Sequence, residues 1–172
     1  MQNAESSNAA SHLPVLQLYG LFMVTWSVLE TAVQTAIIRE LNVDASKGIV
    51  ITSGMQFRQR VSVLSSLLRL ATPTQSEAIA LLGKIEKKTK RNMLVHGHII
   101  VGVPGELTFV KSSATEGEGL KAKKATFNEA QLLRHINELN SEIKRLQALL
   151  NLSDTEMEAV SNEALRVASS EV

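Results

Sequence analysis

Three side chains that together can act on a phosphodiester bond lie close to one another near the middle of the chain. Arg91, Asn92 and His96 occur in the segment Lys-Arg-Asn-Met-Leu-Val-His-Gly, which spans residues 90–97. An arginine supplies a permanent, forked cation for a phosphate. A histidine can exchange protons with a substrate near neutral pH. The residue types therefore predict an RNA-cleaving site in this segment.

The residues just before this trio carry a local excess of positive charge. Four lysines precede it, with Glu86 as the one acid among them: Lys84, Lys87, Lys88 and Lys90. Such a cluster attracts a phosphate backbone, with an affinity that falls as salt is added. We predict that these lysines bind RNA. The alternative is a solvated helix face whose charge complements the negative end of the helix.

A metal site is not expected. His98 follows His96 by two residues and would pair with it in an extended segment, but no Asp or Glu nearby completes a set of ligands. The chain has four histidines and no cysteine, which excludes disulfides, thiolate ligands and cysteine nucleophiles. We predict no metal and no cofactor, in a protein of a reducing compartment, the cytoplasm.

The composition is that of a soluble globular protein. The chain has 172 residues, 44% of them hydrophobic and 20% charged, with a formal net charge of +1. Any affinity for RNA must then come from a local patch and not from the whole chain. Residues 13–29 are apolar, but Gln17, Thr25 and Ser27 interrupt them, and no Lys or Arg precedes them. We predict a buried helix and no membrane role.

The spacing of apolar residues predicts two helices before residue 71. Residues 1–12 are small and polar and are expected to form a flexible leader. The first helix then covers residues 14–41, with one apolar face for the core and another for a partner subunit. A connection through Asn42 and Gly48 leads to a second helix at residues 53–70.

Capping signals predict where the third helix starts and stops. Thr72 is the expected cap, Pro73 occupies the first helical position, and Gln75 completes a capping box. The helix is expected to reach about residue 95, and Gly97 would end it. The trio therefore lies at the end of this helix.

Strand-forming residues follow the trio, and helical spacing then returns. Residues 98–103 and 107–111 predict a small hairpin around Pro104-Gly105, and residues 120–125 predict a third short strand. Thr126 and Glu129 form a second capping box, which opens a long helix with a seam of Leu132, Ile136, Leu139, Ile143, Leu146 and Leu150. Ser153 and Glu156 are expected to cap a last helix.

These segments together predict a mainly α protein. We expect an up-and-down bundle of four to five helices, with a small β-hairpin inserted after the third helix. The bundle would cover residues 13–151, with the insert at about 98–125. Residues 152–172 would form a C-terminal helical extension.

A single helix does not present all three residues of the trio equally. Asn92 and His96 are four residues apart and share a face, whereas Arg91 lies about 140° from His96 around the helix. Three arrangements remain open. Arg91 reaches around the helix, the helix unwinds at Gly97, or a two-fold dimer places two trios across a shared groove.

The segment from Arg91 to Gly97 resembles the motif of the HEPN superfamily (higher eukaryotes and prokaryotes nucleotide-binding). Its ribonuclease members carry an arginine, a polar residue and then a histidine, as Arg91-Asn92 and His96 do here. A helical bundle with the motif late in its third helix is also similar. The likeness covers roughly residues 13–151.

This resemblance implies a metal-independent endoribonuclease that works as a homodimer, often a toxin or defence component with an antitoxin or other regulatory protein as partner. His96 would be the general base or acid for attack of the ribose 2′-hydroxyl on the adjacent phosphate. Arg91 would stabilise the phosphate, and Asn92 would orient the phosphate or His96. Other members of the superfamily do not cleave RNA, so a dimeric module that binds a nucleotide, RNA or protein is the alternative.

Overall fold

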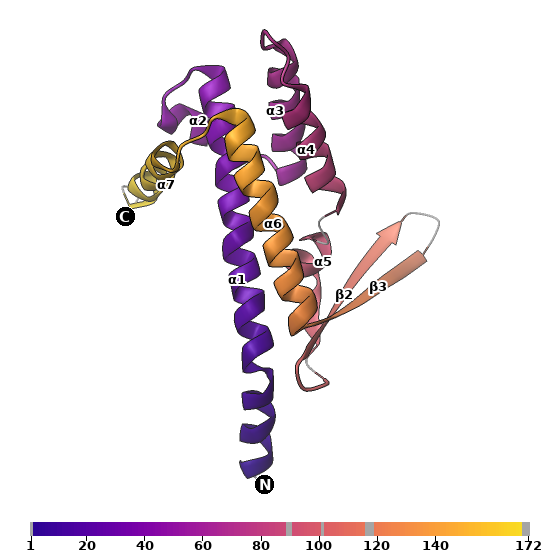
Figure 1. Cartoon of the computed structure of the whole chain (residues 1–172). Helices are drawn as coiled ribbons and strands as arrows, with labels where there is room; N and C mark the ends of the chain where they lie inside the picture. The colour runs from indigo at the N-terminus through magenta and orange to yellow at the C-terminus, as the bar shows by residue number, and fades with distance from the viewer. Residues whose placement is uncertain (1, 89–90, 101, 116–118, 170–172) are drawn as a thin grey trace. The chain divides into compact units, whose positions relative to one another are not determined.

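The protein is mainly helical and contains one small antiparallel sheet (Figure 1). The computed structural model describes the backbone of residues 2–88, 91–100, 102–115 and 119–169, and the side chains of 12–87, 93–100, 102–112 and 121–169. The helices are α1 (Gln2–Leu41), α2 (Ala45–Ser53), α3 (Phe57–Leu70), α4 (Ser76–Lys88), α5 (Arg91–His96), α6 (Glu129–Leu150) and α7 (Asp154–Ser169). The strands are β1 (His98–Ile100), β2 (Glu106–Thr115) and β3 (Gly119–Asn128), in the order β1-β2-β3.

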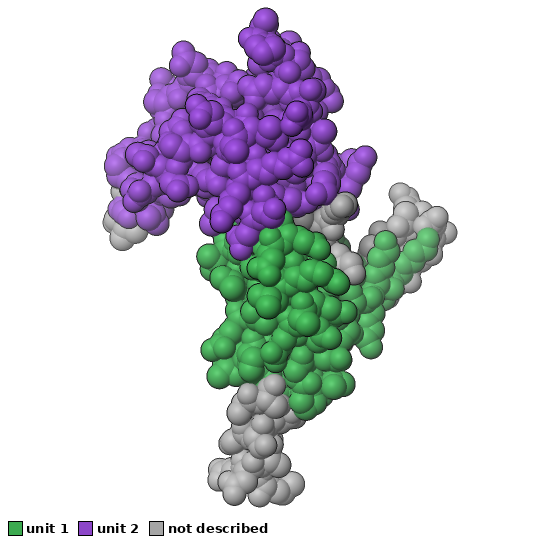
Figure 2. Space-filling view, viewed as in Figure 1, with its two compact units in different colours: residues 1–25, 89–139 green, residues 26–88, 140–172 purple. Residues whose placement is uncertain are grey.

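The chain divides into two compact units (Figure 2). Unit 1 consists of residues 1–25 and 89–139, and unit 2 consists of residues 26–88 and 140–172. Unit 1 therefore holds the start of α1, α5, the sheet and the first half of α6. Unit 2 holds the other helices together with the remaining parts of α1 and α6.

Aromatic rings form the centre of unit 1. The ring of Phe109 on β2 lies 5.4 Å from that of Tyr19 on α1 and 5.7 Å from that of Phe127 on β3. His135 on α6 continues the series, with its ring 5.8 Å from Phe127. These spacings are those of favourable tilted and edge-to-face ring pairs. The core of this unit thus joins two helices to one face of the sheet.

Buried aliphatic side chains and cross-helix ion pairs hold unit 2 together. Leu64 and Leu68 of α3 and Leu82 of α4 have no exposed surface. Around them, carboxylates pair with cations of other helices, in Arg58–Glu86 at 3.0 Å, Lys84–Glu142 at 2.8 Å and Arg145–Glu77 at 3.9 Å. The ion pairs join α3 to α4 and α4 to α6, around an apolar interior that supplies most of the stability.

The first helix begins earlier than the sequence indicated. α1 starts at Gln2, so the structure describes helical backbone in most of the segment that we expected to be a flexible leader. Ala4, Ala9 and Ala10 in this segment are strong helix formers. Lengthening an existing helix also adds a hydrogen bond for each residue without a new nucleation step.

Helix α2 was not predicted. Residues 42–52 were expected to be a connection, but Asp44 caps a helix by accepting a hydrogen bond from the backbone N–H of Lys47 at 2.9 Å. Gly48 lies inside this helix because a Cβ there would be 2.3 Å from Cγ1 of Ile38. The glycine therefore allows α2 to pack closely on α1 and does not mark a loop.

The predicted start of the third helix was wrong. Thr72 and Pro73 lie in a bend, and α4 begins at Ser76. The backbone N–H of Gln75 bonds to the carbonyl oxygen of Leu68 at 3.3 Å, so this stretch still packs against the end of α3. The expected continuation to residue 95 is described as α4 and α5, and residues 89–90 between them lie outside the described residues.

Of the two caps predicted for the last two helices, one is correct and the other is wrong. Asn128 and Gln131, and not Thr126 and Glu129, cap α6, with reciprocal hydrogen bonds of 2.9 and 3.0 Å between side chain and backbone. Thr126 remains in β3. Ser153 and Glu156 cap α7 as predicted. The apolar seam of α6 is buried along its whole length, which confirms the predicted packing face.

One segment of α1, His12–Glu40, is long and apolar enough to cross a membrane by length and composition alone. Within its most apolar window, 56% is buried inside the protein, and the core helix of a soluble protein satisfies the same criteria. A cytoplasmic location without a membrane role therefore stays a prediction.

Glu163 links α7 to α2 in unit 2. Both of its carboxylate oxygens accept hydrogen bonds from Arg166, at 2.7 and 2.8 Å, and the hydroxyl of Ser46 on α2 donates another. The bonds from Arg166, followed by that from Ser46, lower the pKa of Glu163 from 4.5 to about 2. The charged carboxylate thus favours the contact between these two helices.

This pKa predicts how acid affects the stability of the protein. A carboxyl group with a lowered pKa in the folded state stabilises that state above pH 4.5 and loses the contribution as the pH falls to about 2. The thermal midpoint of the wild type should exceed that of Glu163→Gln at neutral pH, and the difference should shrink over this range. Glu158→Gln, which changes an exposed carboxylate on the same helix, is the control. A difference that stays constant with pH would contradict the assignment.

Candidate functional site

All three residues of the trio belong to α5, in unit 1. The side chains of Arg91 and Asn92 lie outside the described residues, as does the whole of Lys90. Their approach to His96 therefore stays a prediction. The structure does define how the described part of α5 is held, and thus where His96 is placed.

The last turn of α5 is attached to α1 by one hydrogen bond and one buried side chain. Leu94 is 1% exposed, and its carbonyl oxygen accepts a hydrogen bond of 2.8 Å from the hydroxyl of Tyr19. Burial raises the pKa of the Tyr19 phenol above its ordinary value of 10.0. Because the same ring packs on Phe109, Tyr19 connects α5 both to α1 and to β2.

Gly97 ends α5 where there is no room for a side chain. A Cβ at residue 97 would lie 2.4 Å from the carbonyl oxygen of Met93 and 3.2 Å from Cβ of Phe109. The backbone N–H of Gly97 bonds to that same Met93 oxygen at 2.9 Å. Among the described glycines only Gly105 has a positive φ, so space and not a left-handed conformation requires the glycine at residue 97.

His96 is the last residue of α5, and its side chain is exposed. Its neighbours Leu94 and Gly97 are held by the contacts just described, so an accessible imidazole is attached to a constrained backbone. An imidazole of this kind can take a proton from a bound hydroxyl or return one. His98 is also exposed, on β1, where it pairs with Val110.

The lysines that we expected to bind RNA differ in their contacts and in their exposure. The Nζ of Lys84 lies 2.8 Å from Oε1 of Glu142, so its charge is shared with a carboxylate of unit 2. Lys87 is exposed on α4. The side chain of Lys88 lies outside the described part of the chain. An RNA-binding role for these residues stays a prediction.

A second group of lysines was not predicted from the sequence. Lys111 on β2 and Lys123 on β3 are directly opposite each other in the ladder, and Lys124 follows. Lys123 and Lys124 are exposed, and Lys111 is partly exposed. The predicted loop at residues 117–119 was an approximate signal. A turn centred on it would set residue 111 opposite residue 125, two residues from Lys123 and on the same face of the strand.

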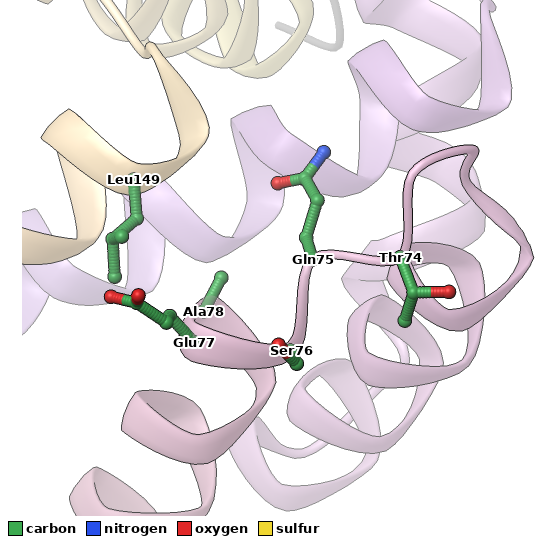
Figure 3. Close-up of a pocket in the computed structure, with 6 residues that line it drawn as sticks. All are labelled: Thr74, Gln75, Ser76, Glu77, Ala78 and Leu149. Carbon is green, nitrogen blue, oxygen red and sulfur yellow. The ribbon is translucent and has the colours of Figure 1, made fainter.

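Unit 2 has a recess of about 240 Å³ beside the start of α4 (Figure 3). Its lining residues are Thr74, Gln75, Ser76, Glu77, Ala78 and Leu149. Glu77 is its one ionisable group, and the carboxylate lies 3.9 Å from Arg145. The recess therefore lacks a pair of groups for acid–base chemistry. Among the residues that the structure describes, no three His, Asp or Glu are grouped to hold a metal ion.

Comparison with known proteins identifies no relative. No protein-family model matches this chain. No curated protein and no solved structure matches it either. The assignment of the candidate site therefore rests on the residues and the geometry described above.

The space at residue 97 gives the first test of this site. Gly97→Ala should lower the free energy of unfolding by about 1–3 kcal/mol, because the new methyl group meets backbone atoms that must move. Gly83→Ala is the matched control, since a Cβ there meets nothing within 4 Å. That change in the middle of α4 should raise stability by roughly 0.5–1 kcal/mol. Equal stability of the two variants in urea denaturation would contradict the close contact.

Tyr19 gives the second test, because it is the only tyrosine of the chain. Alkaline titration of tyrosine absorbance should show a midpoint above 10.0 in the folded protein and a lower one in urea. A raised pKa means that stability is complete below the unfolded value and is lost as the pH rises through the folded one. Tyr19→Phe should cost about 0.5–1.5 kcal/mol of stability by removing the bond to Leu94. A midpoint unchanged by urea would contradict the burial of this hydroxyl.

Proposed function

We propose that this protein is a metal-independent endoribonuclease of the HEPN type, with Arg91, Asn92 and His96 as its catalytic residues. The observation that carries the proposal is the trio itself, which ends in an exposed histidine on a backbone held by Leu94, Tyr19 and Gly97. An accessible proton-transfer group on a constrained backbone is what acid–base catalysis requires.

The proposed reaction uses the nucleophile that RNA itself contains. His96 takes the proton from a ribose 2′-hydroxyl, whose oxygen attacks the adjacent phosphorus. The bond from phosphorus to the 5′-oxygen of the next nucleotide breaks, and this oxygen leaves as a hydroxyl after it takes a proton from water. Arg91 stabilises the negative charge that develops on the phosphate oxygens, and Asn92 orients the phosphate or the imidazole. The products are a 2′,3′-cyclic phosphate and a 5′-hydroxyl. The reaction needs neither a metal ion nor a covalent enzyme intermediate.

We also propose an up-and-down bundle that dimerises, so that two copies of the trio share a groove. Exposed apolar residues on α1 support this part of the proposal: Leu13, Leu21 and Val24 are 54%, 48% and 62% exposed. Residues 13, 21 and 24 share one helical face in unit 1, and a second copy of the chain would cover it. In a cytoplasmic toxin or defence protein, an antitoxin or regulatory partner would restrain this activity.

A non-catalytic dimeric module is the second candidate function. The same apolar face of α1 favours it, because dimerisation through this face does not depend on His96. A module of this kind would bind a nucleotide, RNA or protein without turnover. The two functions therefore differ in whether any RNA is cut.

Cleavage of end-labelled RNA in excess EDTA tests the nuclease. Wild-type protein should cut and leave cyclic phosphate ends, and His96→Ala should reduce the rate by at least about 10²–10⁴-fold because the proton acceptor is gone. Arg91→Ala should have a comparable effect without loss of folding. His98→Ala removes an exposed imidazole two residues away and is the control that should keep its activity. A folded dimer that cuts none of several RNAs would favour the binding module.

A further inference from the structure

The outer half of the β2–β3 ribbon continues the face of the sheet that packs in unit 1. Alternate residues of a strand share a face, and directly paired residues lie side by side on it. Leu107, Phe109 and Phe127 form the buried part of this face. Two residues beyond Phe109 comes Lys111, with Lys123 opposite. The face therefore changes from apolar and buried to basic and accessible within one step of the pleat.

Lys111 and Lys123 are like charges at directly opposed positions. Such positions bring side chains to about 5 Å at Cβ, and like charges there are destabilising. In the described part of the chain neither lysine has an ion-pair partner, and Lys124 also lacks one. On the other face of the same strands, Thr108 and Thr126 are opposed and share a hydrogen bond of 2.9 Å. An anion bound between the two lysines would relieve their repulsion.

The lysine pair lies beside the end of α5. His98 pairs with Val110 in the antiparallel ladder. One step further along are Gly97, which precedes His98, and Lys111, which follows Val110. Gly97 also lies against Phe109, two residues from Lys111 and about 7 Å from it along the strand. A charged chain held by Lys111 would therefore pass close to the end of α5, where His96 is exposed.

We infer that Lys111 and Lys123 bind the phosphate backbone of single-stranded RNA and guide it to His96. The inference rests on the proposed nuclease function. Cations spaced along a ribbon fit a polyanion, because each neutralised phosphate releases counterions. Residues 110–124 contain no aromatic side chain for stacking on bases. The ribbon therefore positions RNA through its backbone and selects no sequence.

The proposed site is confined to the strands. Glu116 and Glu118 of the connecting loop lie outside the described residues and form no part of it. The lysines of α4 differ from this pair, since Lys84 already has the carboxylate of Glu142. An acidic protein segment is the competing occupant. Its binding to the lysines would also weaken with salt, so direct competition between RNA and polyglutamate distinguishes the two.

The test measures the salt dependence of RNA binding. All variants carry His96→Ala, so that the labelled single-stranded RNA of about 12 nucleotides stays intact. Fluorescence anisotropy over roughly 0.05–0.3 M salt gives the slope of log affinity against log salt. Lys111→Gln with Lys123→Gln should reduce this slope by about 1.4, which is about 0.7 for each lost phosphate contact. At 0.1 M salt, affinity should fall by about 25-fold.

Matched charge removal elsewhere is the control. Arg69→Gln with Lys144→Gln removes two exposed charges, from α3 and α6, and should leave the slope unchanged. The Lys111/Lys123 variant should keep its thermal midpoint or gain slightly, because the change removes a repulsion. A slope equal to that of the His96→Ala parent would overturn the inference. So would a parent that binds no RNA at low salt, or equal competition by polyglutamate at all salt concentrations.

The two proposals fail in different ways. If protein with His96 intact cuts no RNA but the slope depends on Lys111 and Lys123, the nuclease fails and the RNA-binding ribbon stands. If RNA is cut and the slope does not change, the ribbon fails and the nuclease stands. With both correct, Lys111→Gln and Lys123→Gln should raise the RNA concentration needed for half-maximal cleavage and leave kcat unchanged.

Discussion

Residue 97 lies so close to the carbonyl oxygen of Met93 and to Phe109 that only glycine fits there. This close contact decides where the chain leaves α5. It lets His98 enter β1 and pair with Val110, which in turn sets the position of β2 and of Lys111. The hydroxyl of Tyr19 holds the same turn from the other side through the carbonyl oxygen of Leu94. The exposed imidazole of His96 and the basic ribbon thus depend on one backbone position without a side chain.

The two units use their charges in different ways. In unit 2, Arg58, Lys84 and Arg145 lie within salt-bridge distance of carboxylates on neighbouring helices. These pairs add modestly to helix packing, and they leave those cations less available to a ligand. In unit 1, Lys111 and Lys123 lie side by side without such partners among the described residues. The fold thus tolerates repulsion between these two lysines, as is expected of a surface that binds a ligand.

Prediction from the sequence succeeded where the determining contacts are local. Ser153 and Glu156 lie three residues apart, and their capping box formed as expected. Thr126 and Glu129 have the same spacing but do not cap, because Thr126 pairs with Thr108 of the adjacent strand and Asn128 takes the capping role. Gly48 was interpreted as part of a loop, although its lack of a side chain allows contact with Ile38. In both cases a partner distant in sequence outweighed the local pattern.

In the candidate site, too, some contacts between distant residues have no signal in the sequence, whereas one such contact has a signal. The closeness of Arg91, Asn92 and His96 follows from sequence spacing, but the bond from Tyr19 to Leu94 joins residues 75 apart and has no local signal. The opposition of Lys111 and Lys123 is different. An antiparallel ladder pairs residues at equal distances from its midpoint, so the pairing of Thr115 with Gly119 implies that of Lys111 with Lys123. The predicted loop at residues 117–119 puts the two lysines on the same face, although it shifts their pairing by two residues. Basic residues placed symmetrically about a predicted turn therefore indicate a shared basic face even when the net charge of the chain is only +1.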